Sequence, residues 1–175
     1  MLEDLEAMSH TRHERERIAR QPVADRSRGP AVATSVDGVA EVAALLDRHL
    51  SQCRRHRSLL ALVCVSVDCV DTESGQGVVP TDTERAAHLE VLNRICSRVR
   101  GSDVVLRPND RDACVILPGA SEEAARRIAG RLLRALNGAY RIDDQVLQVN
   151  VQVGSAAHPA DGSLAPELLR RATGW

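Results

Sequence analysis

The sequence predicts an α/β domain with a single central sheet, mainly antiparallel or mixed, flanked by helices. Residues 59–67 form a continuous apolar run of strand length, which is typical of a strand buried on both faces. Over residues 146–153, Leu and Val alternate with Gln and Asn, which predicts a strand with one face in water. Apolar residues at helical spacing separate these two strands, so helices are expected to cover the sheet.

Helices are expected at four places, each marked by apolar residues three or four positions apart. The first begins near Ser35 or Asp37, because either polar side chain can cap a helix. Ser121 is expected to cap the third helix. The second helix ends near Gly101 and the third near Gly138, since glycine commonly terminates helices. The approximate helical ranges are 37–53, 84–99, 121–137 and 166–172.

A β-hairpin is predicted between the second and third helices. Residues 104–106 and 113–117 are apolar runs, and Pro108, Asn109 and Asp110 lie between them. Pro, Asn and Asp favour tight turns, because Pro presets one backbone angle and Asn and Asp bond their own backbone. These two runs are therefore expected to pair as antiparallel strands of the central sheet.

The domain is expected to span residues 36–175, after an N-terminal tail and linker over residues 1–35. Residues 1–21 are rich in Arg, Glu and His, and a few apolar residues at helical spacing leave open a short helix that packs on a partner. Residues 22–35 contain the Pro, Gly, Ser and Thr that are typical of a linker. We therefore expect residues 1–35 to be flexible or partly helical.

Composition and charge argue against several classes of function. The net charge of −1 gives no bulk attraction to nucleic acid or to a membrane surface. No apolar run is long enough to span a membrane, and the first residues lack the pattern of a signal peptide, so a cytoplasmic location is expected. The five cysteines show no CxxC spacing, and a zinc site at Cys53 and His56 would lack a second close pair of ligands, so no metal site is expected. No cofactor is expected either.

Three segments carry motifs in a specific order. Residues 66–71 read Ser-Val-Asp-Cys-Val-Asp, residues 107–113 read Arg-Pro-Asn-Asp-Arg-Asp-Ala, and residues 149–156 read Val-Asn-Val-Gln-Val-Gly-Ser-Ala. They resemble, in that order, Asp-Ile-Asp-x-Phe-Lys, Arg-Tyr-Gly-Gly-Asp-Glu-Phe and Val-Thr-Val-Ser-Ile-Gly-Val-Ala of the GGDEF family, the diguanylate cyclase domain. The resemblance covers about residues 38–173 and implies a nucleotide-cyclase-like fold.

The resemblance also implies that the cyclase chemistry is lost. In the family, two carboxylates hold the divalent metal ions that act on GTP, and their positions are Ser66 and Arg111 here. The two signature glycines, which let the backbone approach phosphate, are Asn109 and Asp110. Nearby acids such as Asp112 could bind a metal ion in another way, or lie in solvent as turn residues. We expect no catalytic residue, no metal and no enzymatic activity.

A second family feature is present. Many members carry a product-binding Arg-x-x-Asp motif ahead of the signature, and Arg100 to Asp103 match it in sequence and in offset. Arg131 falls at the position of a further family arginine on the next helix. The resemblance implies that Arg100, Asp103 and Arg131 bind cyclic di-GMP, because an Arg fork and a carboxylate can both read guanine. Alternatively, Asp103 caps the turn and the two arginines serve helix ends and solvent.

These features lead to ranked hypotheses. The first is a catalytically inactive GGDEF-like receptor that binds cyclic di-GMP and forms a homodimer linked by the ligand. The second is a protein-interaction module that binds no nucleotide, with an unknown protein partner. A surviving diguanylate cyclase is third, because Ser66 and Arg111 occupy the metal-binding positions.

Overall fold

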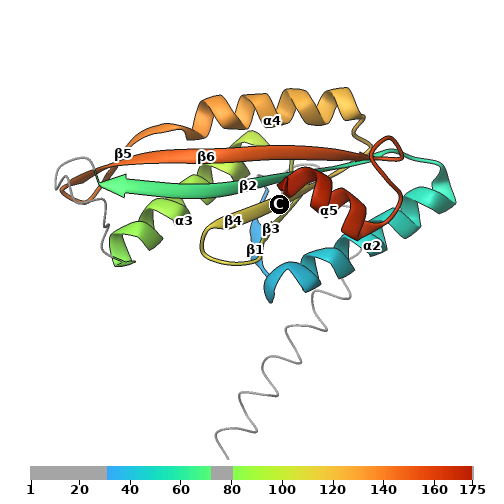
Figure 1. The fold of residues 1–175 in the computed structure, drawn as a ribbon, viewed down its shortest axis with the longest axis horizontal. Helices are drawn as coiled ribbons and strands as arrows, with labels where there is room; N and C mark the ends of the chain where they lie inside the picture. The colour runs from blue at the N-terminus through green and yellow to red at the C-terminus, as the bar shows by residue number, and fades with distance from the viewer. Residues whose placement is uncertain (1–30, 72–80, 175) are drawn as a thin grey trace, which may run out of the picture.

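The computed structural model describes residues 31–71 and 81–174 of the chain. The predicted tail over residues 1–21 and the first part of the predicted linker lie outside the described residues. The described residues form a six-stranded sheet in the order β1-β3-β4-β2-β6-β5, with helices on both faces (Figure 1). The strands are β1 Ala33–Ser35, β2 Leu60–Asp71, β3 Val104–Arg107, β4 Asp112–Pro118, β5 Gly138–Ile142 and β6 Gln145–His158.

The two long strands β2 and β6 lie side by side in the sheet. They are antiparallel and remain in register from Leu60 opposite His158 to Asp71 opposite Leu147. Every residue from 60 to 65 is buried, which confirms the predicted strand buried on both faces. Both strands are longer than the sequence predicts, because each pairs with the other beyond its apolar run.

The predicted hairpin is confirmed. Strands β3 and β4 are antiparallel, with Val104 opposite Ile116 and Leu106 opposite Cys114. Strand β4 also pairs with β2 over seven positions, from Leu60 opposite Pro118 to Ser66 opposite Asp112. The turn over residues 108–111 therefore lies beside the carboxyl-terminal half of β2.

Two helices pack on each face of the sheet. The apolar faces of α3 and α4 join one hydrophobic core, and those of α2 and α5 join a second core on the opposite side. The helices are α2 Gly38–His56, α3 Thr81–Arg98, α4 Glu122–Leu136 and α5 Ala165–Thr173. At the start of α4, Ser121 accepts a hydrogen bond from the Ala124 amide, which confirms the predicted cap. Asp37 starts α2 without a side-chain cap; its own amide donates to Glu41 instead.

Two strands were not predicted. Strand β1 falls inside the range assigned to the linker, where it pairs parallel to β3 with Ala33 opposite Val105. The folded part therefore begins before residue 36, and β1 makes an otherwise antiparallel sheet mixed. Strand β5 begins at Gly138, which the sequence analysis expected to end a helix, and pairs with β6. Both strands are short and have little alternation, so their pairing partners rather than their own sequences make them strands.

None of the helices within residues 31–71 and 81–174 has the length and apolar character needed to cross a membrane.

Candidate functional site: the arginine groove and the hairpin turn

The three residues expected to bind a ligand come together in one groove between α4 and the turn that follows α3. Arg100 and Asp103 lie in the turn from α3 to β3, and Arg131 lies on α4. The groove has a volume of about 580 Å³. Its lining contains five arginines and one buried acid, together with small and apolar residues. These charged residues are Arg100, Arg126, Arg127, Arg131, Arg134 and Asp103. We call this site the arginine groove.

The turn from Arg100 to Asp103 is closed by two hydrogen bonds. The Asp103 amide donates to the Arg100 carbonyl at 2.9 Å, and the Arg100 amide donates to Asp103 Oδ2 at 2.7 Å. Asp103 is only 8% exposed. Burial raises the pKa of its carboxyl, against the lowering effect of the Arg100 amide and of the Arg100 and Arg131 charges. The side chain is therefore a fixed carboxylate at the base of the groove, with one oxygen already engaged.

The arginines of the groove differ in their partners. Arg126 and Arg127 each form an ion pair one helical turn away, with Glu122 and Glu123. The Arg131 guanidinium donates to the Arg98 carbonyl at the end of α3. Within the described part of the chain, the guanidinium groups of Arg100 and Arg134 donate no hydrogen bond. The guanidinium groups of Arg100 and Arg134 are therefore available to an anionic ligand.

Part of the alternative in which Asp103 and the arginines only hold the local structure is observed. Asp103 does cap its turn, and an arginine does bond the carboxyl end of α3. That arginine is Arg131, however, whereas the alternative assigned this role to Arg100. The three residues are therefore brought together, and two of them also hold the local structure.

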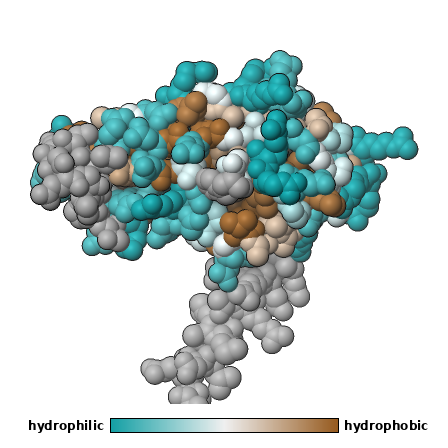
Figure 2. Space-filling model, in the orientation of Figure 1, coloured by the Kyte–Doolittle hydropathy of each residue, from teal (hydrophilic) through white to brown (hydrophobic). Residues whose placement is uncertain are grey.

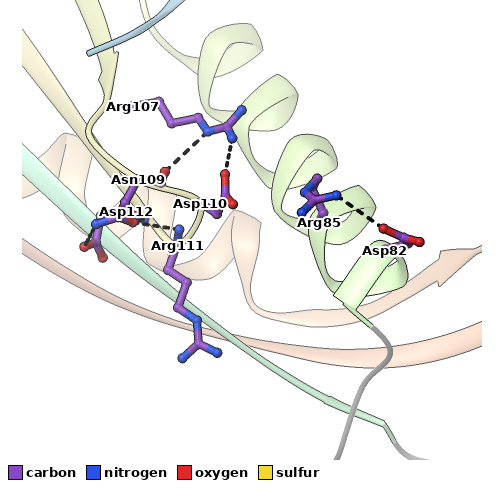
Figure 3. A network of polar contacts seen from close by, with 7 residues as sticks. All are labelled: Asp82, Arg85, Arg107, Asn109, Asp110, Arg111 and Asp112. Atoms are coloured by element: carbon purple, nitrogen blue, oxygen red, sulfur yellow. Dashed lines mark hydrogen bonds and ion pairs between the residues drawn. The ribbon is translucent and has the colours of Figure 1, made fainter. Parts of the chain in front are cut away.

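The hairpin turn at the other end of β3 is a closed polar network (Figure 3). Asn109 Oδ1 accepts from the Arg111 amide at 2.7 Å and from the Asp112 amide at 2.8 Å. Asn109 Nδ2 donates to Asp112 Oδ2 at 2.7 Å. Across the turn, Arg107 pairs with Asp110. The Asn109 side chain thus replaces backbone contacts that would otherwise close the turn.

The positively charged side chain of Arg111 lies between this turn and α3. The Arg111 guanidinium pairs with Glu84 Oε1 at 3.0 Å, and Glu84 lies in the first turn of α3. The Arg111 carbonyl accepts from the Val67 amide at 2.9 Å, which holds the turn against β2. No local pattern in the sequence points to Glu84, because it lies 27 positions from Arg111 and only the packing of α3 beside the hairpin joins the two residues.

The acids that the structure describes near the turn are not arranged as a metal site. Among residues 31–71 and 81–174, no three His, Cys, Asp or Glu side chains gather closely enough to hold a metal ion. Ser66 pairs in register with Asp112, whose carboxylate already accepts from Asn109. Asp68 is exposed and lies opposite Asn150 on the neighbouring strand.

A buried Cys–His contact lies close to the turn and was also missed. Cys69 Sγ lies 3.6 Å from His88 Nε2. Burial lowers the pKa of His88 and raises the pKa of Cys69 to about 11. Both side chains are therefore neutral near pH 7, so the pair has neither a thiolate nucleophile nor a charged imidazole.

Comparisons with known proteins agree with this fold. A family model described as the diguanylate cyclase GGDEF domain matches residues 88–174. The cyclic di-GMP phosphodiesterase NbdA of Pseudomonas aeruginosa is 26% identical over 132 residues, which cover 71% of this chain and 16% of the relative. The bifunctional diguanylate cyclase/cyclic di-GMP phosphodiesterase MucR of the same organism is 25% identical over 81 residues, which cover 46% of this chain and 12% of the relative. The chain thus spans less than a fifth of the length of these curated relatives.

Solved structures show the same architecture. The GGDEF domain of YfiN, also named TpbB, from Pseudomonas aeruginosa matches with a TM-score of 0.64 and 26% identity, over 77% of this chain and 84% of that one. A sensory box/GGDEF family protein from Caulobacter crescentus matches with a TM-score of 0.63 and 22% identity, over 77% of this chain and 86% of that one. The sheet order, the hairpin and these matches lead to one assignment. This chain belongs to the GGDEF domain family.

Proposed function

We propose that this domain is a receptor for cyclic di-GMP that does not synthesise it. The observation that carries the proposal is the arginine groove, where the unpaired Arg100 and Arg134 guanidinium groups flank the buried Asp103 carboxylate. A groove of about 580 Å³ falls within the range of small-molecule sites. Arg126 and Arg127 are paired with glutamates, but three further arginines against one buried acid leave the groove positively charged, which favours an anionic ligand such as a dinucleotide.

The chemistry of the groove suits guanine as well as phosphate. The Arg100 guanidinium has two parallel N–H donors, which can bind guanine O6 and N7 together or grip a phosphate. Asp103 uses Oδ2 for the Arg100 amide, so its other oxygen remains for the guanine N1–H or exocyclic amine. Arg131 stays tethered to the end of α3, and this places its charge at the rim of the groove.

The absence of catalysis is part of the same proposal. Divalent metal ions need hard anionic ligands, and the two expected carboxylate positions hold Ser66 and Arg111. The ion pair between Arg111 and Glu84 supports this interpretation, because it puts a positive charge where a metal ion would be required. With GTP and Mg²⁺ or Mn²⁺, we expect no cyclic di-GMP by chromatography. Product that accumulates with time, and that Asp112→Ala abolishes, would refute this part of the proposal.

A module that binds proteins and no nucleotide is the alternative. It is favoured by the internal use of Asp103 and Arg131, which both satisfy backbone groups of this chain. Under this alternative the arginines are a solvated surface, and a protein partner binds elsewhere on the domain.

Calorimetric titration separates the two proposals. We expect the full chain to bind cyclic di-GMP at micromolar concentration or tighter and to bind GTP more weakly. Arg131→Ala should weaken binding less than a substitution of Arg100, and its effect should fade as salt rises, because an exposed charge is screened. Arg55→Ala is the matched control, since Arg55 is an exposed arginine in the last turn of α2. If no binding of cyclic di-GMP is detected at tens of micromolar ligand, the alternative of a protein-interaction module is favoured.

The receptor proposal includes a homodimer linked by the ligand. Two stacked dinucleotides present guanine edges and phosphates on both sides, so two arginine grooves can share them. Light scattering after size exclusion should give a monomer mass without ligand and a dimer mass with cyclic di-GMP. Binding without any change in mass would remove the dimer from the proposal and keep the receptor.

A further inference from the structure

A second groove lies on the other face of the sheet, between α2, α5 and the start of β4. Its volume is about 430 Å³. Its walls are mainly apolar residues of the two helices, and Figure 2 shows hydrophobic side chains exposed on this face over the first turns of α2. The lining includes two cysteines of the central strands, Cys64 of β2 and Cys114 of β4. We call it the thiol groove.

The two thiols face each other directly. Cys64 and Cys114 are register partners on antiparallel strands, and both belong to the core on the α2 and α5 side. Their sulfur atoms are 3.0 Å apart. Directly opposite residues of an antiparallel pair have Cα atoms about 4.5 or 5.5 Å apart, and both spacings lie within the range that a disulfide bridges. Small side-chain rotations are therefore enough to join the sulfur atoms.

We propose that Cys64 and Cys114 form an oxidation site, at which hydrogen peroxide that enters the thiol groove converts the two thiols into a disulfide between β2 and β4. One thiol loses its proton, and its sulfur attacks a peroxide oxygen, which breaks the O–O bond and gives a sulfenic acid and water. The second sulfur attacks the sulfenic sulfur, forms the S–S bond and releases a second water. The two thiols lose two electrons in total, and one hydrogen peroxide is reduced to two waters.

The other thiols in the described part of the chain have different surroundings. Cys53 is buried in the same core, but its sulfur contacts the Leu59 carbonyl at 3.7 Å. Cys69 contacts His88 on the opposite face of the sheet. Cys96 is partly buried against that opposite core as well. The pair at the thiol groove is thus the one whose geometry matches a disulfide.

The pair is expected to react slowly. The hydrogen bond with Cys114 and burial both raise the pKa of the Cys64 thiol, so little thiolate is present near neutral pH. Both cysteines are 5% exposed, so the oxidant must be small enough to enter the groove. This site is independent of the nucleotide proposal, because it lies across the sheet from the arginine groove.

The test is oxidation of the full chain with hydrogen peroxide, followed by blocking of free thiols and mass spectrometry without reductant. Cleavage at arginine leaves Cys64 and Cys69 on one peptide, 58–85, so cleavage before Asp68 is added to separate them. We expect a linked pair of peptides that contain Cys64 and Cys114. Dithiothreitol should release both peptides, and this excludes higher oxidation states of sulfur.

Variants make the assignment specific. Cys64→Ser should abolish the link, whereas Cys69→Ser should retain it. Cys53→Ser should retain it as well and is the matched control, since Cys53 is 6% exposed in the same core. A link through Cys69, or two free thiols at positions 64 and 114 in oxidised wild-type protein, would overturn the proposal. Because that last result is obtained on the wild type, the outcome does not depend on whether a variant folds.

Discussion

The two faces of the sheet are covered by helix pairs that are held in different ways. On the α3 and α4 side, the helices leave a groove lined by arginines, and the Arg131 side chain reaches the carbonyl end of α3. On the α2 and α5 side, α5 presses its backbone onto β6 at Gly154. A Cβ atom at Gly154 would lie 1.9 Å from the Ala172 carbonyl oxygen. The first face therefore carries a groove lined by charged side chains. The second carries the mainly apolar thiol groove and a close backbone contact between α5 and β6.

This difference predicts that ligand binding and folding stability depend on different faces of the sheet. Exposed arginines contribute little to folding, because solvent screens their charges and their side chains remain mobile. Backbone contact between a helix and a strand leaves no room for adjustment, since interiors are close-packed. Substitutions on the α3 and α4 side should change ligand binding, whereas substitutions at the α5 contact should change stability.

The largest expected effect is that of Gly154→Ala. The added methyl group meets backbone rather than a movable side chain, so α5 must shift away from β6. We expect a loss of about 3 kcal/mol in the free energy of unfolding, at the upper end for an overpacked site. Urea denaturation followed by circular dichroism measures it.

The matched control for that variant is Gly130→Ala on α4. There a Cβ atom would meet only the Arg134 guanidinium, at 3.6 Å. Alanine is favoured over glycine inside a helix, so this variant should gain up to about 1 kcal/mol. Equal effects of the two alanines would break the comparison between the faces.

The next largest effect is expected for Arg100→Ala, and the measured quantity is the affinity for cyclic di-GMP. The variant removes a guanidinium that has no hydrogen-bonded partner among the described residues. We expect cyclic di-GMP affinity to fall by about 30-fold, which corresponds to about 2 kcal/mol for a bidentate charged contact. The midpoint of urea unfolding should stay the same. A loss of stability with unchanged affinity would place Arg100 in the fold rather than in the ligand site.

A smaller effect is expected for Asn109→Ala at the hairpin turn. The variant removes three hydrogen bonds, two to backbone amides and one to Asp112. Because the turn is exposed, water replaces part of their contribution, and we expect a loss of about 1 kcal/mol in unfolding free energy. Asn109→Asp keeps the oxygen for the two amides and should fall between the wild type and the alanine variant. Cyclic di-GMP affinity should not respond to either variant.

The smallest effect is a pH dependence at Asp103. Burial raises the pKa of this carboxyl above its unfolded value, so the folded state holds its proton to higher pH than the unfolded state. Stability from this group is therefore present below the unfolded pKa and is lost as pH rises through the folded pKa. Asp103→Asn does not titrate and can still accept from the Arg100 amide. Its advantage over wild type should grow from acid toward neutral pH in urea titrations; an advantage that shrinks would contradict the raised pKa.

The predictable elements share one property: their own residues contain the signal. The run at 59–67, the alternation at 146–153 and the Ser121 cap are local patterns, and each is found in the structure. Strand β5 has no such pattern. It exists because Tyr140 pairs with Leu147, buries its ring under Arg94 and donates to the Leu136 carbonyl. Gly138 therefore predicts the end of a helix from the sequence, but the strand that begins there depends on pairing with β6.

By itself, the sequence determined the class of fold, the hairpin and the residues that carry the family's motifs, because periodicity and turn chemistry act over a few neighbouring positions. Only the tertiary structure decided which of those residues meet. It brought Arg131 to the end of α3, Arg111 to Glu84 and Cys64 to Cys114, pairs that are 27 or more positions apart. Contacts of this kind depend on how helices and strands pack against one another, and packing is a property of the whole domain rather than of any one segment.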